Sequence, residues 1–454
     1  MARLSAATAL LALASSAAAA GEFGLTRWSE DHRDLADAAR SDSPLDAIKH
    51  IPLGEGAGHY LSFGGQWRLK PVSFDAPLFG LGAAGADGYV YQRLNLHADW
   101  QAGPRFRAYL EIGDARVWGK KAAPAVIDAN HTDLQLGFVD FRAPVSQAQL
   151  RLRLGRQELM FDSAQRFVAL REGPNVRRAF DGALLDGALG DWTLSAFHLA
   201  AVEYRNTDPF DDRSDSGIDF SGLRLRRAFP SAQVDGYWYR YSRDQAAFGG
   251  QRARERRDTV GAQSTGRAGA FDWDLEAAWQ TGDFGAAPVR AWAFGSVLGY
   301  SLEEMPWRSR LGLQFDAASG DRRAGDGRLD TFNPLFPKAA YFSQAGLTDF
   351  ANLVHAGAFL ILRPSAGSSF GIAAGHMARQ SRADAAYAQP LLPIPRSTGD
   401  DKDIGDYLRL NASYRVNRHL TLSGEFLRYR PAPSLRRVGA DTADYAELVA
   451  RFLF

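Results

Sequence analysis

Residues 271–280 read FDWDLEAAWQ, and the alternation in this stretch decides the fold. Successive side chains of a β-strand point to opposite faces, so every second residue shares a face. The apolar face holds Phe271, Trp273, Leu275, Ala277 and Trp279, and the polar face holds Asp272, Asp274, Glu276 and Gln280. The stretch therefore predicts a strand that separates an apolar environment from a wet one.

The same two-faced pattern recurs in residues 150–154, 307–316 and 408–415. A soluble β-sandwich also alternates in this way, because one face of each sheet packs on a core. Two features favour a membrane barrel instead. Tryptophan and tyrosine gather near segment ends, as at membrane interfaces, and the polar faces are dense in arginine, which suits a wet lumen. The sequence thus predicts an all-β chain that forms a transmembrane antiparallel β-barrel.

The number of strands and the lengths of their connections support this prediction. We expect about 18 strands, centred near residues 65, 94, 110, 137, 152, 182, 198, 222, 237, 262, 275, 295, 312, 356, 373, 411, 424 and 449. Short connections at 101–104, 143–147, 187–191, 228–232, 267–270, 303–306, 363–368 and 417–418 alternate with long ones at 71–88, 117–131, 156–176, 205–216, 243–257, 319–348, 380–404 and 431–441, and the connection at 282–289 is modest. Short periplasmic turns and long extracellular loops are the asymmetry of outer-membrane barrels.

The two ends of the chain agree with delivery to the outer membrane of a Gram-negative bacterium. Residues 1–20 combine a basic start, an apolar run and a small-residue end, which predicts a cleaved secretory signal peptide. We assign 21–58 to a periplasmic N-terminal segment and 59–454 to the barrel. Charged residues interrupt every later window of about 18 residues, so no membrane-spanning helix is expected. The chain finishes on Phe454, an ending that resembles the recognition signal of the outer-membrane assembly machinery.

Composition excludes some partners and points to others. The chain has 53 basic and 52 acidic residues, so its net charge is near zero and implies no attraction to nucleic acid. It contains no cysteine. Only six of the basic residues are lysines, so the other 47 are arginines. A GC-rich genome would explain this bias. The alternative is that guanidinium groups, which bind carboxylates bidentately and keep their charge, line a path for anions.

Several short motifs point in the same direction when their order and spacing are taken together. They are PLDAIKHIPL at 44–53, YLSFGGQWR at 60–68, RLGRQEL at 153–159, NVRRAFDG at 175–182, FNPLFP at 332–337 and GADTADY at 439–445. From about residue 44 to its end, the chain resembles the alginate-export family of outer-membrane porins. The resemblance implies a monomeric eighteen-stranded barrel whose arginine-rich lumen passes an anionic polysaccharide. It leaves other anionic organic solutes open as cargo.

Alternating arginines and one charged connection are the candidate pore residues. On the lumen wall we expect Arg68, Arg93, Arg105, Arg107, Arg151, Arg153, Arg308, Arg310, Arg409 and Arg415. Residues 155–181 carry too many charges to face lipid, so part of this stretch should fold inward as a constriction. Its charged members are Arg156, Glu158, Asp162, Arg166, Arg171, Glu172, Arg177, Arg178 and Asp181. The competing interpretation is that these charges form internal salt bridges that only brace the barrel.

Other features leave further functions open. The acidic stretch 208–215 and the trio Asp321, Asp326 and Asp330 offer oxygen ligands to Ca²⁺, although solvated loop charge is the simpler explanation. The basic run 252–257 is placed to meet lipopolysaccharide, and residues 237–241, YWYRY, are suited to sugar stacking or, more simply, to an interfacial girdle. No catalytic, metal-site or cofactor motif is present, so an enzyme is not expected. The alternative to an anion channel is an uptake porin for less charged or aromatic molecules. Periplasmic secretion proteins would be partners of an exporter.

Overall fold

The computed structural model of the chain describes residues 23–41, 43–54, 56, 58–161, 164–323 and 325–454. The predicted signal peptide lies outside the described residues. The strands are β1 (Ile51–Pro52), β2 (His59–Phe74), β3 (Asp87–Ala102), β4 (Phe106–Trp118), β5 (Asn130–Val145), β6 (Ala148–Gln157), β7 (Phe180–Leu189), β8 (Trp192–Glu203), β9 (Arg213–Ala228), β10 (Ala232–Phe248), β11 (Gln251–Ala268), β12 (Phe271–Phe284), β13 (Ala287–Leu302), β14 (Ser309–Ala318), β15 (Leu353–Ser365), β16 (Ser368–Ala378), β17 (Tyr387–Ala388), β18 (Leu392–Pro393), β19 (Asp403–Arg415), β20 (Leu420–Pro431) and β21 (Ala443–Leu453). The helices are η1 (Arg27–Ser29), η2 (Arg33–Ala36), η3 (Ala38–Arg40), η4 (Pro44–Ile48), η5 (Pro77–Gly80) and α1 (Pro433–Arg437).

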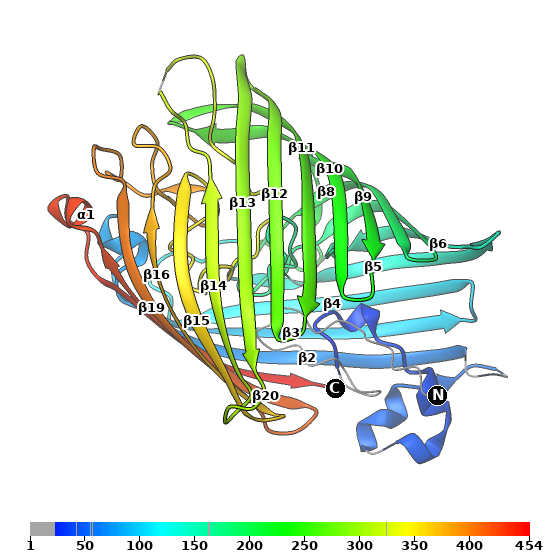
Figure 1. Cartoon of the computed structure of the whole chain (residues 1–454). Coiled ribbons are helices and arrows are strands. Elements are labelled where there is room, and N and C mark those ends of the chain that lie inside the picture. Colours follow the sequence, from blue (N-terminus) through cyan, green and yellow to red (C-terminus); the bar gives the residue numbers. More distant parts are fainter. Residues whose placement is uncertain (1–22, 42, 55, 57, 162–163, 324) are drawn as a thin grey trace.

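The long strands form one closed antiparallel barrel (Figure 1). One sheet holds 19 strands, and the short β1 pairs only with the start of β2, so eighteen strands make the wall. Each wall strand pairs with the next in chain order, with β16 passing directly to β19, and β2 closes the ring by pairing with both β3 and β21. The predicted barrel of about eighteen strands is confirmed, and every expected strand centre lies within a wall strand.

The alternation in sequence becomes the inside and outside of this wall. On β14, Leu313 is 62% exposed on the outer surface, whereas Asp316 on the opposite face is 0% exposed. On β12, the outward Trp279 is exposed and the inward Asp274 and Glu276 are buried. An apolar outer surface and a polar interior are what a barrel in a bilayer requires. None of the helices within the described part of the chain is long and apolar enough to cross a membrane.

The connections alternate between short and long as expected, except after β10 and after β12. The modest connection expected at 282–289 is a two-residue turn at Gly285 and Ala286. The expected long loop at 243–257 is wrong, because β10 and β11 continue to a two-residue turn at Gly249 and Gly250. Both glycines have positive φ angles, 55° and 78°, which favour glycine and produce a tight hairpin. The arginine-rich run 252–257 is therefore part of a strand, with Arg256 paired to Ser242 across the hairpin.

Two long connections, 158–179 and 319–352, fold into the barrel rather than away from it. They meet in a parallel bridge between Val168 and Phe336. Phe336 also packs on Phe220 and Tyr241, two inward-facing rings of the wall. An extracellular position was expected for 319–348, but its phenylalanines bury more apolar surface inside. The interior of the barrel is therefore packed like a protein core.

Candidate pore constriction

The connection 158–179 is docked on the inner face of β2 and β3 by hydrogen bonds to its backbone. Arg68 donates to the carbonyl oxygens of Glu172 at 2.7 Å and Pro174 at 2.9 Å. Lys70 donates to the carbonyl of Gly173 at 3.0 Å. These donors come from alternate positions of one strand, so the inner face of β2 presents a row of cations to the connection. The expected inward fold of this stretch is therefore observed.

Four arginines surround the carboxylate of Glu172, and we call this group the Glu172 cage. Its members are Arg68, Arg93 and Arg451 from the wall and Arg177 from the connection itself. The nitrogen–oxygen distances are 3.6 Å to Arg68, 2.9 Å to Arg451 and 3.4 Å to Arg177, and Arg93 donates a direct hydrogen bond. Burial opposes the charged form, but the arginines hold the pKa of Glu172 well below its ordinary value. The cage binds one carboxylate with four guanidinium groups.

Other expected lumen arginines are buried on the inner face but are paired with acidic side chains of the wall. Arg107 donates to both oxygens of Asp99, at 2.7 and 2.9 Å. Arg153 binds Asp140 in the same bidentate way, and Arg310 binds Asp272. Sequence reasoning missed these acidic partners, although each lies on the predicted inner face of its strand. These arginines have the geometry of braces.

Arg151, Arg409 and Arg415 are wall residues with different surroundings. Arg151 is half-buried and pairs with Asp186 of the neighbouring strand. Arg409 is buried and donates to the carbonyl of Phe342 in the inward connection. Arg415 is half-buried at the end of β19. Arg151 and Arg415 lie near strand ends on the side of the short turns, whereas Arg409 lies in the middle of β19, so the three do not form one ring.

Two expected wall arginines lie elsewhere. Arg105 is in the turn between β3 and β4, and Arg308 is in the turn before β14; both are exposed. Trp307 and Arg308 have positive φ angles of 65° and 44°, so the strand begins only at Ser309. The alternation near residue 308 thus extends into a turn, and the lumen placement of Arg105 and Arg308 is wrong.

The charged residues expected in the constriction separate into distinct groups. Arg156 and Asp181 form a salt bridge at 2.9 Å on the face that carries the outward Leu154 and Leu185, so they lie outside the lumen. Arg171 lies against the ring of Tyr204.

The remaining residues of this set hold the connection in place. Arg178 lies over the ring of Phe336, and Arg166 is buried between Asp274 and Glu276 of β12. Asp162 lies outside the described residues. Only Arg177 of the expected constriction arginines therefore contacts the Glu172 carboxylate.

The N-terminal segment also enters the barrel interior, which the sequence did not predict. The indole of Trp28 donates to Glu158 at 2.9 Å, and Arg153 of the wall lies 4.6 Å from the centre of the Trp28 ring. Glu158 also binds Arg177 of the cage, at 2.7 Å. The 3-10 helices of this segment, dark blue in Figure 1, lie near the C-terminal end of the chain. The segment thus reaches the constriction from the periplasmic end of the barrel.

Sequence reasoning also missed Arg451. Leu448, Ala450 and Phe452 alternate with Arg451 along the last strand, so the opposite parity of Arg451 was available as a signal. No such signal indicated that the connection 319–352 folds into the barrel, because the residues that Phe336 contacts there are distant in sequence.

Comparison with known proteins gives three results. The family model described as alginate export matches residues 59–447. No curated protein matches the sequence. Solved structures with a similar fold include OccK11 (OpdR) of Pseudomonas aeruginosa, with 14% identity, 87% of this chain and 96% of that chain covered, and a TM-score of 0.56.

Two further structures are similar to a comparable degree. OccAB3 of Acinetobacter baumannii has 10% identity, coverage of 86% and 99%, and a TM-score of 0.57. OccK2 (OpdF) of Pseudomonas aeruginosa, solved in complex with glucuronate, has 13% identity, coverage of 87% and 96%, and a TM-score of 0.55. At these identities the likeness concerns the fold, which is that of an outer-membrane porin. Together with the family match over most of its length, this shows that the chain is an outer-membrane β-barrel channel, not an enzyme, and belongs to the alginate export family.

Proposed function

We propose that this protein is a passive conduit for carboxylated saccharides, either an alginate-like polyuronate or smaller uronates. The observation that carries the proposal is the Glu172 cage. Three wall guanidiniums and Arg177 converge on one carboxylate inside the barrel. A uronate sugar presents the same group, so it can replace Glu172 at the cage without a change in the chemistry of the contact. The family match supports this assignment, as does the glucuronate bound to the similar OccK2 barrel.

The pairing of the remaining arginines suits conduction. An anion crosses a pore only where binding is favourable yet shallow and repeated. Wall acids such as Asp99 and Asp140 neutralise Arg107 and Arg153, which limits the depth of any trap along the wall. Glu172 has the same effect at the cage, because a passing carboxylate must compete with a tethered one. The cage is then a site of exchange.

The test is block of ion current by a uronate oligomer, with the purified full chain in a planar bilayer. Arg451→Gln removes a cage donor that is partly exposed. Among the described residues, the Arg451 guanidinium donates to Glu172 and, with the Gln66 amide turned, to Gln66. Arg428→Gln is the matched control, because Arg428 pairs with Asp444 on the outer face. We expect the concentration for half-block to rise several-fold in Arg451→Gln and to stay unchanged in Arg428→Gln. Equal block in all three proteins, or cation preference in the wild type, would refute the proposal.

A specific observation favours a second candidate, an uptake channel for aromatic solutes. Tyr237, Tyr239 and Tyr241 face inward on β10 and are buried, which corrects their expected position in an interfacial girdle. Phe161 and Phe197 continue this row, with ring centres 6.1 and 5.8 Å from Tyr239. Stronger current block by benzoate than by glucuronate at equal concentration would favour this candidate.

A further inference from the structure

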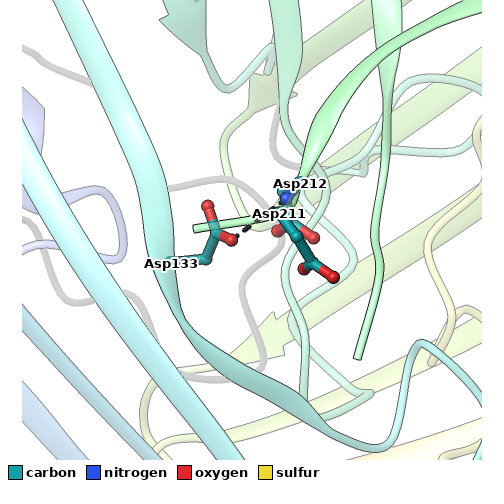
Figure 2. Close-up of side chains that lie close together, drawn as sticks. All are labelled: Asp133, Asp211 and Asp212. Atoms are coloured by element: carbon teal, nitrogen blue, oxygen red, sulfur yellow. Dashed lines mark hydrogen bonds between the residues drawn. The ribbon is translucent and has the colours of Figure 1, made fainter. Parts of the chain in front are cut away.

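Three carboxylates gather at the extracellular end of β5. Asp133 lies near the start of that strand, and Asp211 and Asp212 lie at the end of the connection 204–212 (Figure 2). Each offers an oxygen, and the three oxygens lie within 4.8 Å of one another. Two oxygens bound to one calcium ion at 2.3–2.6 Å are at most about 5 Å apart, so one ion can touch all three.

Among the described residues, the three carboxylates of this cluster form no salt bridge, although Asp133 is only 4% exposed. The nearby guanidinium of Arg156 pairs with Asp181 and donates to the backbone carbonyl of Asp212 at 3.4 Å. Elsewhere, buried carboxylates such as Asp140 and Asp235 are each paired with arginine. Burial and the neighbouring Asp133 raise the pKa of Asp212 to about 6, as expected for like charges held together. Arg156 opposes this shift only in part, so the three carboxylates share no direct ion-pair partner among the described residues.

A second and independent observation points to a ligand. Asn130 is 7% exposed, and its Nδ2 donates to Asp212 Oδ2 at 2.7 Å, so its amide end reaches the cluster. The Oδ1 of Asn130 accepts no hydrogen bond from the described residues, and neither does the buried Oδ1 of Asp211. Rotation of the amide by 180° exchanges Nδ2 for Oδ1 and directs a carbonyl oxygen at the same place. Buried oxygens without a donor are costly. A cation among the three carboxylates would satisfy Asp211 Oδ1, and after the amide rotation it would also satisfy Asn130 Oδ1.

We propose that Asp133, Asp211, Asp212 and the amide oxygen of Asn130 bind a calcium ion. All four are oxygen ligands from carboxylates and an amide, the set that calcium prefers, and waters complete its coordination. The acidic stretch 208–215 supplies two of the ligands, and the strand supplies the other two. The bound ion ties the connection 204–212 to β5, where Phe210 and Asp212 already hydrogen-bond to Thr132 and Asp133.

The site adjoins the anchor of the constriction. Asn175 of the inward connection bonds through its side chain to the carbonyl of Asp128 and through its backbone to Ile127, just before β5 begins. Calcium at Asn130 and Asp133 thus stiffens the segment on which the inward connection rests. This role is separate from anion passage and does not depend on the proposed cargo.

The test is calorimetric titration of CaCl₂ into the EDTA-treated full chain in detergent. We expect one site with a dissociation constant of about 10⁻⁴–10⁻³ M, the range of extracellular calcium modules. The variant Asp211→Asn/Asp212→Asn should weaken binding at least tenfold. The control Asp208→Asn/Asp215→Asn removes equal charge from the same stretch and should bind like the wild type. No site in the wild type, or equal loss in both variants, would overturn the proposal.

A third variant keeps the test decisive where the double substitution disturbs folding. Asn130→Asp adds a carboxylate at the orphan amide and should tighten calcium binding several-fold in a barrel that still migrates heat-modifiably. Weaker or unchanged binding in this variant contradicts the assignment of Asn130 as a ligand. Tighter binding of Mg²⁺ than of Ca²⁺ by the wild type contradicts the choice of metal.

Discussion

Arginine has two different roles in the interior of this barrel. Arg153 is 0% exposed, binds Asp140 through two nitrogens and lies 3.7 Å from the centre of the Phe138 ring. A buried pair of this kind stabilises the fold only while both partners are present, because either charge alone is stranded in a poorly solvated place. The four cage arginines share Glu172 instead, and Arg177 alone also binds a second carboxylate, that of Glu158, so the group carries excess positive charge. Bracing and anion binding are therefore properties of different residues.

The buried pair of Lys70 and Glu447 tests the bracing role. Lys70 Nζ lies 2.7 Å from Glu447 Oε2, and both side chains are buried. In Lys70→Met, the Tyr445 hydroxyl is the one remaining side-chain donor to the Glu447 charge among the described residues. This substitution should lower the free energy of unfolding by about 3–5 kcal/mol. Lys70→Met/Glu447→Met should recover most of that loss. Urea titration followed by the heat-modifiable gel shift measures the free energy of unfolding of both variants. A double variant that is no more stable than Lys70→Met would contradict the bracing role of the pair.

The N-terminal segment is an element whose docking should respond to pH. Lys49 is buried and donates to the carbonyl of Phe63 at 2.9 Å. Burial, together with the nearby Arg27, lowers the pKa of Lys49 to about 7, although Glu30 and Asp46 oppose the shift. The unfolded lysine, with an ordinary pKa of 10.5, binds more protons than the folded one between pH 7 and 10.5. Stability contributed at this position therefore rises with pH across that window.

The corresponding experiment compares the wild type with Lys49→Met. The free energy of unfolding of the wild type, measured in urea, should rise from pH 7 to pH 9.5 relative to that of the variant. Below pH 7 the difference between the two proteins should be constant, since the lysine is protonated in both states. If the difference in free energy of unfolding between the two proteins stays constant from pH 7 to 9.5, Lys49 keeps its charge in the folded protein across this range, and its pKa is not lowered.

The wall elements could be predicted from the sequence, and the interior elements could not. Alternation is local, so a stretch such as 271–280 reveals its strand without knowledge of its neighbours. The β10–β11 hairpin was missed because the polar run 252–257 looks like a loop, although two glycines mark the turn. The cage depends on Arg68 meeting Glu172 and Arg451, residues far apart in the chain. Such contacts follow from barrel closure, which no local pattern encodes.

The connection 319–352 can be removed without opening the wall. Ala318 and Leu353 are paired partners at the ends of β14 and β15, so an Asn-Gly turn can join these strands directly. The shortened protein should keep its heat-modifiable migration and show a larger single-channel conductance, because the packing around Phe336 is lost. Conductance is measured in planar bilayers at high salt. An unchanged value would mean that ions already pass elsewhere, and the connection does not limit the channel.

The whole molecule combines an apolar exterior with a filled and charged interior. Both inward connections and the N-terminal segment contact inward-facing residues of the wall, so the three elements occupy part of the barrel interior. Large cargo therefore requires one of these elements to move, whereas small ions require only water-filled gaps. The electrostatic field in those gaps comes from residues that are fixed by the wall. The selectivity of the channel for small ions should therefore depend on the charge of the interior, without any movement of the inward connections or the N-terminal segment.

Ion selectivity should accordingly depend on salt and on the charge of Glu172. At 0.1 M salt the screening length is about 10 Å, so the cage attracts anions, whereas at 1 M it is about 3 Å and the attraction fades. Reversal potentials across a KCl gradient should show chloride preference that declines between these concentrations. Glu172→Gln removes the one carboxylate that the cage arginines share, and should increase chloride preference at low salt but not at 1 M. The outer-face variant Asp444→Asn removes the same charge outside the lumen and should change neither value. A preference that is constant with salt would indicate selection by size, and a Glu172→Gln protein with lower chloride preference would show that the cage collapses without its carboxylate.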